Sequence, residues 1–375
     1  MKILLLEPSL AGSHAAWANE YAAHSQHDVK ILSLPGKYWK WRMHGGAVTL
    51  ARQFLAGDFC PDLLLATDML DLTTFLALTR KWTAAIPTAI YFHENQLSYP
   101  WSPTDTDPAQ QRDAHYCFIN YSAALAADAV LFNSDYHRRD FFAELPGFLN
   151  SFPDHNNAAT AALIADKSRT LHLGLDLRQL DQYCPAEVQA ASRPPLLLWN
   201  HRWEYDKNPE EFFRALFVLQ DQGVDFNLAV LGESYRKQPE IFTTARTRLS
   251  DKIVHWGYVE NFADYARWLW RADILPVTSN HDFFGASVVQ AIYCNCQPLL
   301  PDRLAYPEHL PEASRGDYLY RDFNDLVERL RQLCLDVRHL RGQQRSQMVA
   351  RYDWEQQGRV YDDLFVSLAF NAETG

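Results

Sequence analysis

The second half of the chain contains the stretch that decides the fold, Leu196–Glu211, with the sequence LLLWNHRWEYDKNPEE. Its four leading apolar residues, Leu196–Trp199, are typical of a buried strand. Asn208 then predicts a helix N-cap, because Pro209 suits the first helical position and Glu211 completes a capping box. The stretch therefore predicts a strand, a polar loop and a helix, which is the repeating unit of a parallel α/β sheet.

Apolar runs of strand length recur on both sides of this stretch and alternate with helical patterns. The expected strands are Ile3–Leu6, Val29–Leu32, Leu63–Ala66, Thr88–Phe92, Ala129–Phe132, Thr170–Leu173, Asn227–Leu231, Ile253–Trp256, Ile274–Val277 and Gln297–Leu300. The pattern weakens at 146–168 and breaks near 180–194, where a linker is expected. The sequence therefore predicts two successive α/β halves, at 1–180 and 190–353, and a C-terminal helical segment at 354–375.

Composition narrows the class of protein. The 375 residues include 35 Lys and Arg against 46 Asp and Glu, a formal charge of −11. This charge disfavours a general nucleic-acid binder, although a local basic patch remains compatible with it. The six cysteines are scattered, and Cys294 and Cys296 are interpreted as buried thiols of a reduced, cytoplasmic protein without a metal site. No signal peptide and no transmembrane helix are expected.

Open parallel sheets bind ligands at the carboxyl ends of their strands. Two such halves facing one another would form a cleft, as in two-domain dehydrogenases, periplasmic-type binding proteins and GT-B transferases. No G-x-G-x-x-G fingerprint follows the first strand, which disfavours a dehydrogenase.

Polar residues follow several of the expected strands. Gly12-Ser13-His14 comes after the first and can bind an anion at a helix N-terminus, although an ordinary turn explains it equally well. Arg202 and Lys207 follow the first strand of the second half, where two cations can hold a diphosphate; the alternative is two solvated loop cations.

Three further segments carry candidate binding residues. Tyr91–Gln96 places His93, Glu94, Asn95 and Gln96 in succession at a strand end, a pattern typical of binding or proton transfer, although one of the four could cap a helix. Tyr38–Gly45 alternates aromatic and cationic residues, including Trp41 and Arg42, and either stacks bases or packs as an amphipathic helix. Asp282 and Gln290 can hydrogen-bond two hydroxyls of one sugar-bearing ligand.

The segment that contains Asp282 and Gln290 resembles the E-x-F-G-x-x-x-x-E signature of family 4 glycosyltransferases, with aspartate and glutamine in place of the two glutamates. A wider set of segments resembles the tRNA-queuosine mannosyltransferases, also called the glycosyltransferase-like domain-containing 1 family. These segments are Glu7–His14, Tyr91–Gln96, Phe132–Ser134, Asn200–Pro209, Phe283–Gly285, Ala291–Cys294 and Tyr306–Glu308. Together they extend over about residues 3–310.

The resemblance implies a GT-B architecture, with two Rossmann-like domains facing a central cleft. It implies an acceptor-side domain at 1–180, a nucleotide-sugar-binding domain at 190–353 and a last helix, 354–375, that crosses back to the first domain. The expected reaction is a retaining transfer of mannose from GDP-mannose to queuosine in the tRNA anticodon, without a cofactor or a metal. The alternatives are another nucleotide-sugar with a small or lipid acceptor, and a non-catalytic nucleoside- or sugar-binding module.

The expected site residues fall into three groups. The catalytic group is His93, Arg202, Lys207 and Asp282. The donor-binding group is Gly12, Ser13, Arg202, Lys207, Asp282, Phe284, Gly285 and Gln290. The acceptor-binding group is His14, Trp41, Arg42, Glu94, Asn95 and Gln96. Lys37–Arg42 and Arg138-Arg139 are expected to supply a basic surface for tRNA.

Overall fold

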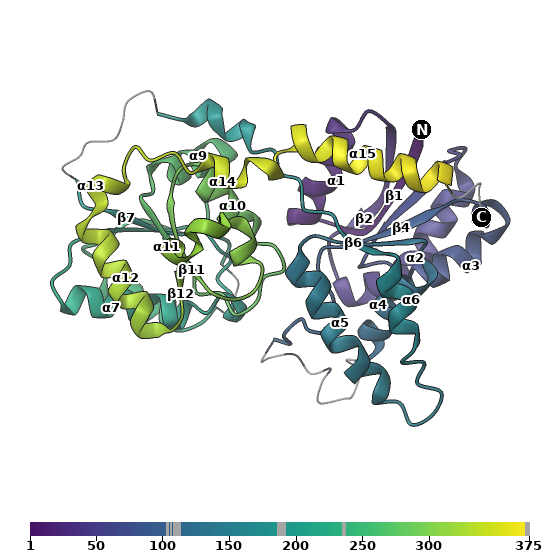
Figure 1. Ribbon diagram of the computed structural model, residues 1–375, viewed down its shortest axis with the longest axis horizontal. Helices are drawn as coiled ribbons and strands as arrows, with labels where there is room; N and C mark the ends of the chain where they lie inside the picture. Colours follow the sequence, from purple (N-terminus) through teal and green to yellow (C-terminus); the bar gives the residue numbers. More distant parts are fainter. Residues whose placement is uncertain (103–104, 106, 108–113, 186–192, 235–237, 372–375) are drawn as a thin grey trace. The chain divides into compact units, whose positions relative to one another are not determined.

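The computed structural model describes residues 1–102, 105, 107, 114–185, 193–234 and 238–371 (Figure 1). The chain divides into two compact units. Unit 1 contains Met1–Leu175 together with Trp354–Gly375, and unit 2 contains Asp176–Asp353. Residues 186–192 of the expected linker lie outside the described part of the chain.

Unit 1 is a parallel sheet with helices between its strands. Its elements are β1 (Lys2–Leu10), α1 (Gly12–His24), β2 (Asp28–Pro35), α2 (Trp39–Ala56), β3 (Leu63–Thr67), α3 (Leu72–Thr83), β4 (Thr88–Phe92), α4 (Ala114–Ala126), β5 (Ala129–Phe132), α5 (Asp135–Asn150), α6 (Thr160–Asp166), β6 (Ser168–Thr170) and α15 (Trp354–Asn371). The strand order is β2-β1-β3-β4-β5-β6, and every pairing is parallel. All residues of β3, β4 and β5 are buried, which explains why their sequences are continuously apolar.

The last helix, α15, packs against α1 within unit 1 (Figure 1). Trp17 Nε1 donates a hydrogen bond to the hydroxyl of Tyr361 at 3.2 Å, and the hydroxyl of Tyr21 donates to Asp362 at 3.2 Å. A Cβ at Gly358 would lie 3.4 Å from the carbonyl oxygen of His24, so the two helices approach closely there. These contacts join residues more than 330 positions apart in the sequence into one core.

Unit 2 is a second parallel sheet. Its elements are η2 (Arg178–Tyr183), β7 (Leu196–Trp199), η3 (Tyr205–Lys207), α7 (Pro209–Asp221), β8 (Asn227–Val230), α8 (Ile241–Arg248), β9 (Ile253–Trp256), α9 (Phe262–Arg271), β10 (Ile274–Pro276), α10 (Ala286–Tyr293), β11 (Gln297–Pro301), η4 (Tyr306–His309), η5 (Glu312–Ser314), α11 (Arg315–Tyr318), β12 (Leu319–Tyr320), α12 (Phe323–Leu335), α13 (Val337–Leu340), α14 (Ser346–Val349) and η6 (Ala350–Tyr352). The strand order is β12-β11-β10-β7-β8-β9, again with parallel pairings.

Local predictions are confirmed at several points. Asn208 caps α7: its side chain accepts a hydrogen bond from the backbone NH of Glu211 at 3.4 Å and donates one to that residue's carboxylate at 2.8 Å. Pro209 occupies the first turn. Cys294 and Cys296 are buried free thiols.

Two strand predictions need correction. The last strand of unit 1 covers Ser168–Thr170, so the strand expected at Thr170–Leu173 lies two residues too late. Leu171 and Leu173 are apolar because they are buried beyond the strand end. The strand at Leu319–Tyr320 was not predicted, since two residues carry no recognisable period.

Each sheet has one topological switch point, at which the chain, after adding strands on one side of its first strand, continues on the other side of that strand. In unit 1 this point lies between β1 and β3, and in unit 2 it lies between β7 and β10. Ligands of open α/β sheets bind outside the carboxyl ends of the strands at such points. Among the described residues, no helix is long and apolar enough to cross a membrane.

Candidate active site

Three polar residues lie at the carboxyl ends of neighbouring strands in unit 1. Glu7 is near the end of β1, Asp68 directly follows β3, and His93 directly follows β4. Glu7 is fully buried and Asp68 is 1% exposed. Because β1, β3 and β4 are adjacent, these groups meet at the edge of the sheet where the chain reverses direction.

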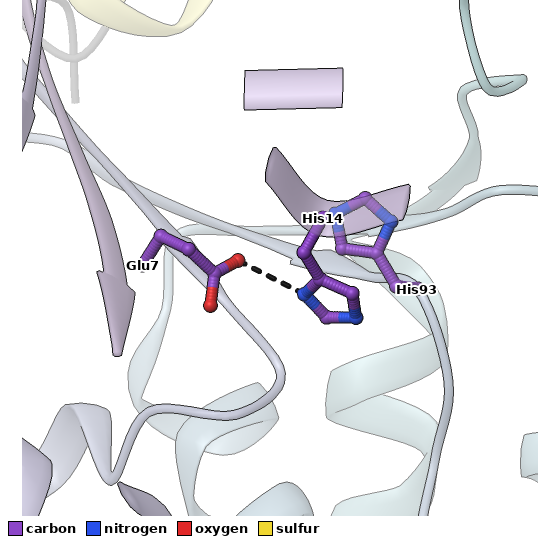
Figure 2. Close-up of side chains that lie close together, drawn as sticks. All are labelled: Glu7, His14 and His93. Atoms are coloured by element: carbon purple, nitrogen blue, oxygen red, sulfur yellow. Dashed lines mark hydrogen bonds and ion pairs between the residues drawn. The ribbon is translucent and has the colours of Figure 1, made fainter. Parts of the chain in front are cut away.

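Glu7, His14 and His93 form a compact cluster (Figure 2). The Nδ1 atom of His14, from the first turn of α1, lies 3.0 Å from a carboxylate oxygen of Glu7. The other carboxylate oxygen accepts a hydrogen bond from the backbone NH of Ser9 at 2.8 Å. The imidazole rings of His14 and His93 have centroids 4.3 Å apart. The structure thus brings together two of the histidines that the sequence analysis singled out.

The two histidines differ in charge. Burial lowers the pKa of His14, but the charges of Glu7, Asp68 and Glu94 outweigh this and raise it to about 9. Burial, and then the neighbouring charge of His14, keeps the pKa of His93 well below its ordinary value. Near neutral pH, His14 is therefore an imidazolium and His93 a neutral imidazole.

His93 is fixed from several sides. Its backbone NH donates to Asp68 at 2.8 Å, and its carbonyl accepts from the side chain of Asn133 at 2.9 Å. Its ring stands edge-on to Trp17 at 4.6 Å and to Tyr91 at 4.8 Å. The Nε2 atom is buried and has no hydrogen-bond partner among the described residues. A preoriented imidazole nitrogen is thus left for a ligand hydroxyl.

The residues after His93 mostly shape the turn. The carbonyl of the fully buried Asn95 side chain accepts backbone hydrogen bonds from Leu97 and Ser98. The Gln96 side chain donates to Glu94 at 3.0 Å. Burial of Asn95 favours a structural role over the expected contact with the acceptor.

The glycine loop opens α1. Gly12 has φ +53°, a left-handed conformation that favours glycine, and Gly12 and Ser13 are exposed. The N-cap residue of this helix makes no side-chain cap hydrogen bond, and the first backbone NH groups of a helix have no intrahelical partner. Anion binding by Gly12 and Ser13 stays a prediction.

Glu7, His14 and His93 also form a group whose ligand atoms lie within 4.8 Å of one another, a spacing that can hold a metal ion. The Glu7 carboxylate and His14 Nδ1 are already joined by a hydrogen bond that holds a proton. A metal at this position would have to displace that proton.

In unit 2, Lys207 and Asp282 meet at the carboxyl ends of β7 and β10. The ammonium of Lys207 donates to the carbonyl of His281 at 2.8 Å and lies 3.4 Å from Asp282 and 3.1 Å from Asp206. Asp282 also accepts a hydrogen bond from the hydroxyl of Tyr306 at 3.1 Å. This buried ion pair lies at the carboxyl ends of two adjacent strands, where the sequence predicts ligand binding, and at the point where the second sheet reverses its direction of growth.

Both members of this pair are charged. Burial lowers the pKa of Lys207, but Asp282 and then Asp206 outweigh it and raise the pKa. Burial raises the pKa of Asp282, but Lys207 outweighs it and lowers the pKa. The site therefore holds a fixed positive charge beside a fixed carboxylate.

Three more of the predicted donor residues lie in unit 2. Arg202 is 47% exposed and pairs with Glu204 at 3.1 Å. Gly285, with φ +89°, precedes α10, and a Cβ there would lie 3.0 Å from the ring of Tyr306. Gln290 accepts a hydrogen bond from the hydroxyl of Tyr265 at 2.8 Å.

Phe284, another predicted donor-binding residue, has a buried ring. It is 3% exposed, and its ring stacks edge-on against His309 at 5.1 Å and Tyr352 at 5.0 Å. This position favours a packing role for the phenyl ring over contact with a donor.

Sequence reasoning missed two residues of this region, Asn200 and His201, as site candidates. Both are buried, and Asn200 Oδ1 and His201 Nε2 have no hydrogen-bond partner in the described part of the chain. Burial and then the charge of Lys207 lower the pKa of His201 to about 4, so it is neutral. Their position directly after β7 was the available signal. Glu7 and Asp68 were missed as well, although each also stands at a strand end.

Comparison with known proteins defines the class. Residues 185–347 match the family of glycosyl transferases group 1, and residues 2–175 match the tRNA-queuosine alpha-mannosyltransferase N-terminal family. The solved structure of HepE from Anabaena in complex with UDP has a TM-score of 0.64 at 14% identity and covers 98% of this chain and 100% of its own. Sucrose-phosphate synthase from Thermosynechococcus elongatus has a TM-score of 0.69 at 14% identity, with coverages of 98% and 100%. The protein is a glycosyltransferase, and the predicted GT-B fold is confirmed.

The particular family follows from a closer relative. The tRNA-queuosine alpha-mannosyltransferase of Drosophila melanogaster is 33% identical over 359 residues, which cover 94% of this chain and 92% of the relative. The chain belongs to the tRNA-queuosine alpha-mannosyltransferase family.

Proposed function

We propose that this protein transfers mannose from GDP-mannose to queuosine in tRNA, with retention of the anomeric configuration. The observation that carries the proposal is the charged Lys207–Asp282 pair at the carboxyl ends of β7 and β10, in a chain of this family. The pair supplies a fixed cation and a fixed hydroxyl-binding carboxylate at the place where an open sheet binds its ligand.

Catalysis of this reaction requires stabilisation of the leaving diphosphate. The bond from the anomeric carbon of mannose to the diphosphate oxygen breaks, and a bond from that carbon to an acceptor hydroxyl oxygen forms. The hydroxyl proton leaves with the GDP product. Negative charge grows on the diphosphate as the bond breaks, so preorganised cations lower the barrier, and no enzymic nucleophile is required.

We propose separate parts for Arg202 and Lys207. Lys207 is buried and holds Asp282 and the carbonyl of His281, so it fixes the loop and supplies charge without moving. Arg202 is partly exposed, and its guanidinium can exchange the Glu204 carboxylate for a diphosphate, with which it forms bidentate hydrogen bonds. Asp282 is proposed to accept hydrogen bonds from the sugar hydroxyls, and Gln290 from the ribose.

In unit 1, His93 is the proposed hydrogen-bonding partner of a substrate hydroxyl. Its neutral charge, its fixed ring and its Nε2 atom, which has no hydrogen-bond partner among the residues that the structure describes, support this role. Burial, and then the positive charge of His14 beside it, keep the pKa of His93 low, so that this ring stays neutral across the physiological pH range. We propose that the transfer needs no metal ion, so EDTA should leave the rate unchanged.

The test compares Arg202→Ala with Arg248→Ala. Arg248 is a matched control because it is 42% exposed and pairs with Asp221 at 2.6 Å, yet it ends α8 at the opposite edge of the same sheet. Mannose transfer from GDP-mannose to queuosine-containing tRNA is measured under single-turnover conditions. Loss of one charge-stabilising donor should slow Arg202→Ala by about 10²–10³-fold and leave Arg248→Ala within about twofold of the native rate.

The thermal midpoints of both variants should match that of the native protein, because exposed ion pairs contribute little to stability. Near-native transfer by Arg202→Ala would remove this residue from the mechanism. A native protein that binds GDP-mannose without ever releasing GDP would instead be a non-catalytic binding module.

A further inference from the structure

A group of exposed residues lies where β2 ends and α2 begins. β2 ends at Pro35 and α2 begins at Trp39, and we name Lys37, Tyr38, Trp41 and Arg42 the α2 aromatic surface. Glu7 on β1 pairs with Ser33 of β2 in the parallel register, so this surface lies at the same sheet edge as the Glu7–His14–His93 cluster.

Tyr38 has an unusual backbone and an unusual exposure. It adopts φ +57° as the residue before α2, a conformation that costs a non-glycine residue about 1–3 kcal/mol. Its carbonyl accepts hydrogen bonds from the backbone NH groups of Trp41 and Arg42 at 2.8 and 3.1 Å. This turn leaves the Tyr38 side chain 79% exposed, so the strain is not offset by burial of the ring.

Trp41 lies against its own helix although it is exposed. A Cβ built at Gly45 would lie 2.4 Å from Cζ2 of Trp41, so the indole occupies the place that a side chain at 45 would fill. The residue nevertheless stays 63% exposed. A large aromatic ring that lies along its own helix and presents its other face to solvent is a ready platform for stacking.

The neighbouring aromatic residue differs. Trp39 packs against Tyr116, with ring centroids 5.1 Å apart, and against Trp101 at 6.4 Å. It therefore belongs to the domain surface on which α2 rests. The sequence left amphipathic packing open as an alternative for this segment. Trp39 and the buried Met43 pack in this way, but Tyr38 and Trp41 do not.

The positive charges of the α2 aromatic surface favour the binding of an anion. Lys40 is neutralised by Asp105 and Asp107. Lys37 and Arg42 form no ion pair with a carboxylate in the described part of the chain, and Arg42 Nε is anchored on the carbonyl of Pro35 at 3.1 Å. Two cations beside two exposed rings stand out against the formal charge of −11 of the whole chain.

We infer that the α2 aromatic surface binds the RNA acceptor, with unpaired bases stacked on Trp41 and Tyr38 and phosphates on Lys37 and Arg42. Single-stranded loops of RNA are recognised by stacking on aromatic rings and by cations along the backbone. The inference rests on the proposed function, because it assumes that the acceptor is a tRNA.

The test uses a second exposed tryptophan as its control. Trp82 is 58% exposed near the end of α3. Arg80 and Lys81 precede it, so this segment combines an exposed tryptophan with two cations, as the α2 aromatic surface does. Because α3 runs from the carboxyl end of β3 back to the start of β4, Trp82 lies at the opposite edge of the sheet. Trp41→Ala and Trp82→Ala thus remove the same side chain at the two edges.

Binding of a queuosine-containing anticodon stem-loop is measured by fluorescence anisotropy at two salt concentrations, and KM and kcat are measured for transfer to full tRNA. Trp41→Ala should weaken RNA binding and raise KM about 5- to 150-fold, which corresponds to loss of one stacked base. Trp82→Ala should change neither value by more than about twofold. Lys37→Ala with Arg42→Ala should reduce the salt dependence of binding.

Gly45→Ala is a second, independent test of the α2 aromatic surface. Alanine favours a helix interior over glycine, yet a Cβ here displaces the indole of Trp41. RNA affinity should fall while the far-ultraviolet circular dichroism of the helices is unchanged.

If Trp41→Ala binds and modifies tRNA like the native protein, or if Trp82→Ala weakens binding as much, the assignment of this surface is wrong while the proposed function stands. If the native protein transfers no mannose to queuosine-tRNA and does not bind the stem-loop, the proposed function and this inference both fall.

Discussion

Replacing Glu7 with glutamine should alter how the stability of the protein depends on pH. Glu7 is fully buried, and its carboxylate contacts His14 at 3.0 Å. The substitution keeps the size of the side chain and removes the charge that holds the proton on His14. The expected consequence is that the pKa of His14 falls from about 9 toward or below its ordinary 6.5, because burial then opposes the charged form.

The magnitude follows from the two pKa values of His14. A histidine whose pKa rises from 6.5 in the unfolded chain to about 9 in the folded chain stabilises the fold by about 3 kcal/mol. This contribution is fully present below pH 6.5 and is lost as the pH rises through 9. Burial, opposed by the charge of His14, raises the pKa of Asp68 to about 8. The folded state therefore binds more protons than the unfolded chain at this residue as well, so Asp68 also makes the stability fall as the pH rises.

The assay is urea unfolding followed by tryptophan fluorescence at pH 6.5, 8 and 9.5. The native protein should lose about 3 kcal/mol of unfolding free energy over this range from His14 alone. Glu7→Gln should be destabilised by up to about that amount at pH 6.5. Its decline toward pH 9.5 should be smaller than the native one by the contribution of His14, and only the part due to Asp68 should remain.

Asp362→Asn is the matched control. Asp362 is another buried carboxylate of unit 1, bound to Ser25 Oγ at 2.6 Å and the backbone NH of Gln26 at 2.8 Å. Its loss should lower the stability by similar amounts at pH 6.5 and 9.5. If Glu7→Gln retains the native decline between pH 6.5 and 9.5, the charge assignment of His14 is refuted.

Three further changes test unit 2. Lys207→Ala leaves the carboxylate of Asp282 without its cation and should cost about 3–5 kcal/mol of stability by urea unfolding, a loss that native-like stability would contradict. Gln290→Ala should raise KM for GDP-mannose about 2- to 10-fold in steady-state kinetics, and it also leaves the hydroxyl of Tyr265 without its acceptor. An unchanged KM would remove Gln290 from the donor site. Asn208→Ala should cost about 1 kcal/mol or more, and Asn208→Gly should cost less because φ is +52°; equal costs in thermal unfolding would disprove the cap argument.

The sequence was sufficient for most of the fold because the central strands of both units are buried on both faces. Runs such as Leu63–Ala66 and Leu196–Trp199 are continuously apolar for that reason, and glycine, asparagine and proline mark the ends of the helices. The two-residue strand Leu319–Tyr320 escaped prediction because its position depends on pairing with β11, a tertiary contact.

The site was only partly predictable. Lys207 and Asp282 were expected on separate loops, and their contact depends on the adjacency of β7 and β10, which the order of residues does not reveal. The same holds for Glu7 and Asp68, which come together with His93 only because β1, β3 and β4 are neighbours in the sheet.

The basic surface expected for tRNA shows a further limit of sequence reasoning. Lys40 counts as a cation in the sequence, but Asp105 and Asp107, more than 60 residues away, neutralise it. Arg138 donates to Ser168 Oγ at 2.8 Å and lies over the ring of Phe142, so part of that cation is used within the fold. Which cations remain available to a ligand is therefore decided by long-range contacts.

The central claim is that this chain moves a mannosyl group onto queuosine in tRNA. The most direct measurement incubates the purified protein with radiolabelled GDP-mannose and two tRNA preparations that differ only in the presence of queuosine. We expect label in the queuosine-containing tRNA alone, with one GDP released for each mannose transferred. Equal labelling of both tRNAs, or transfer only from another nucleotide-sugar, would contradict it.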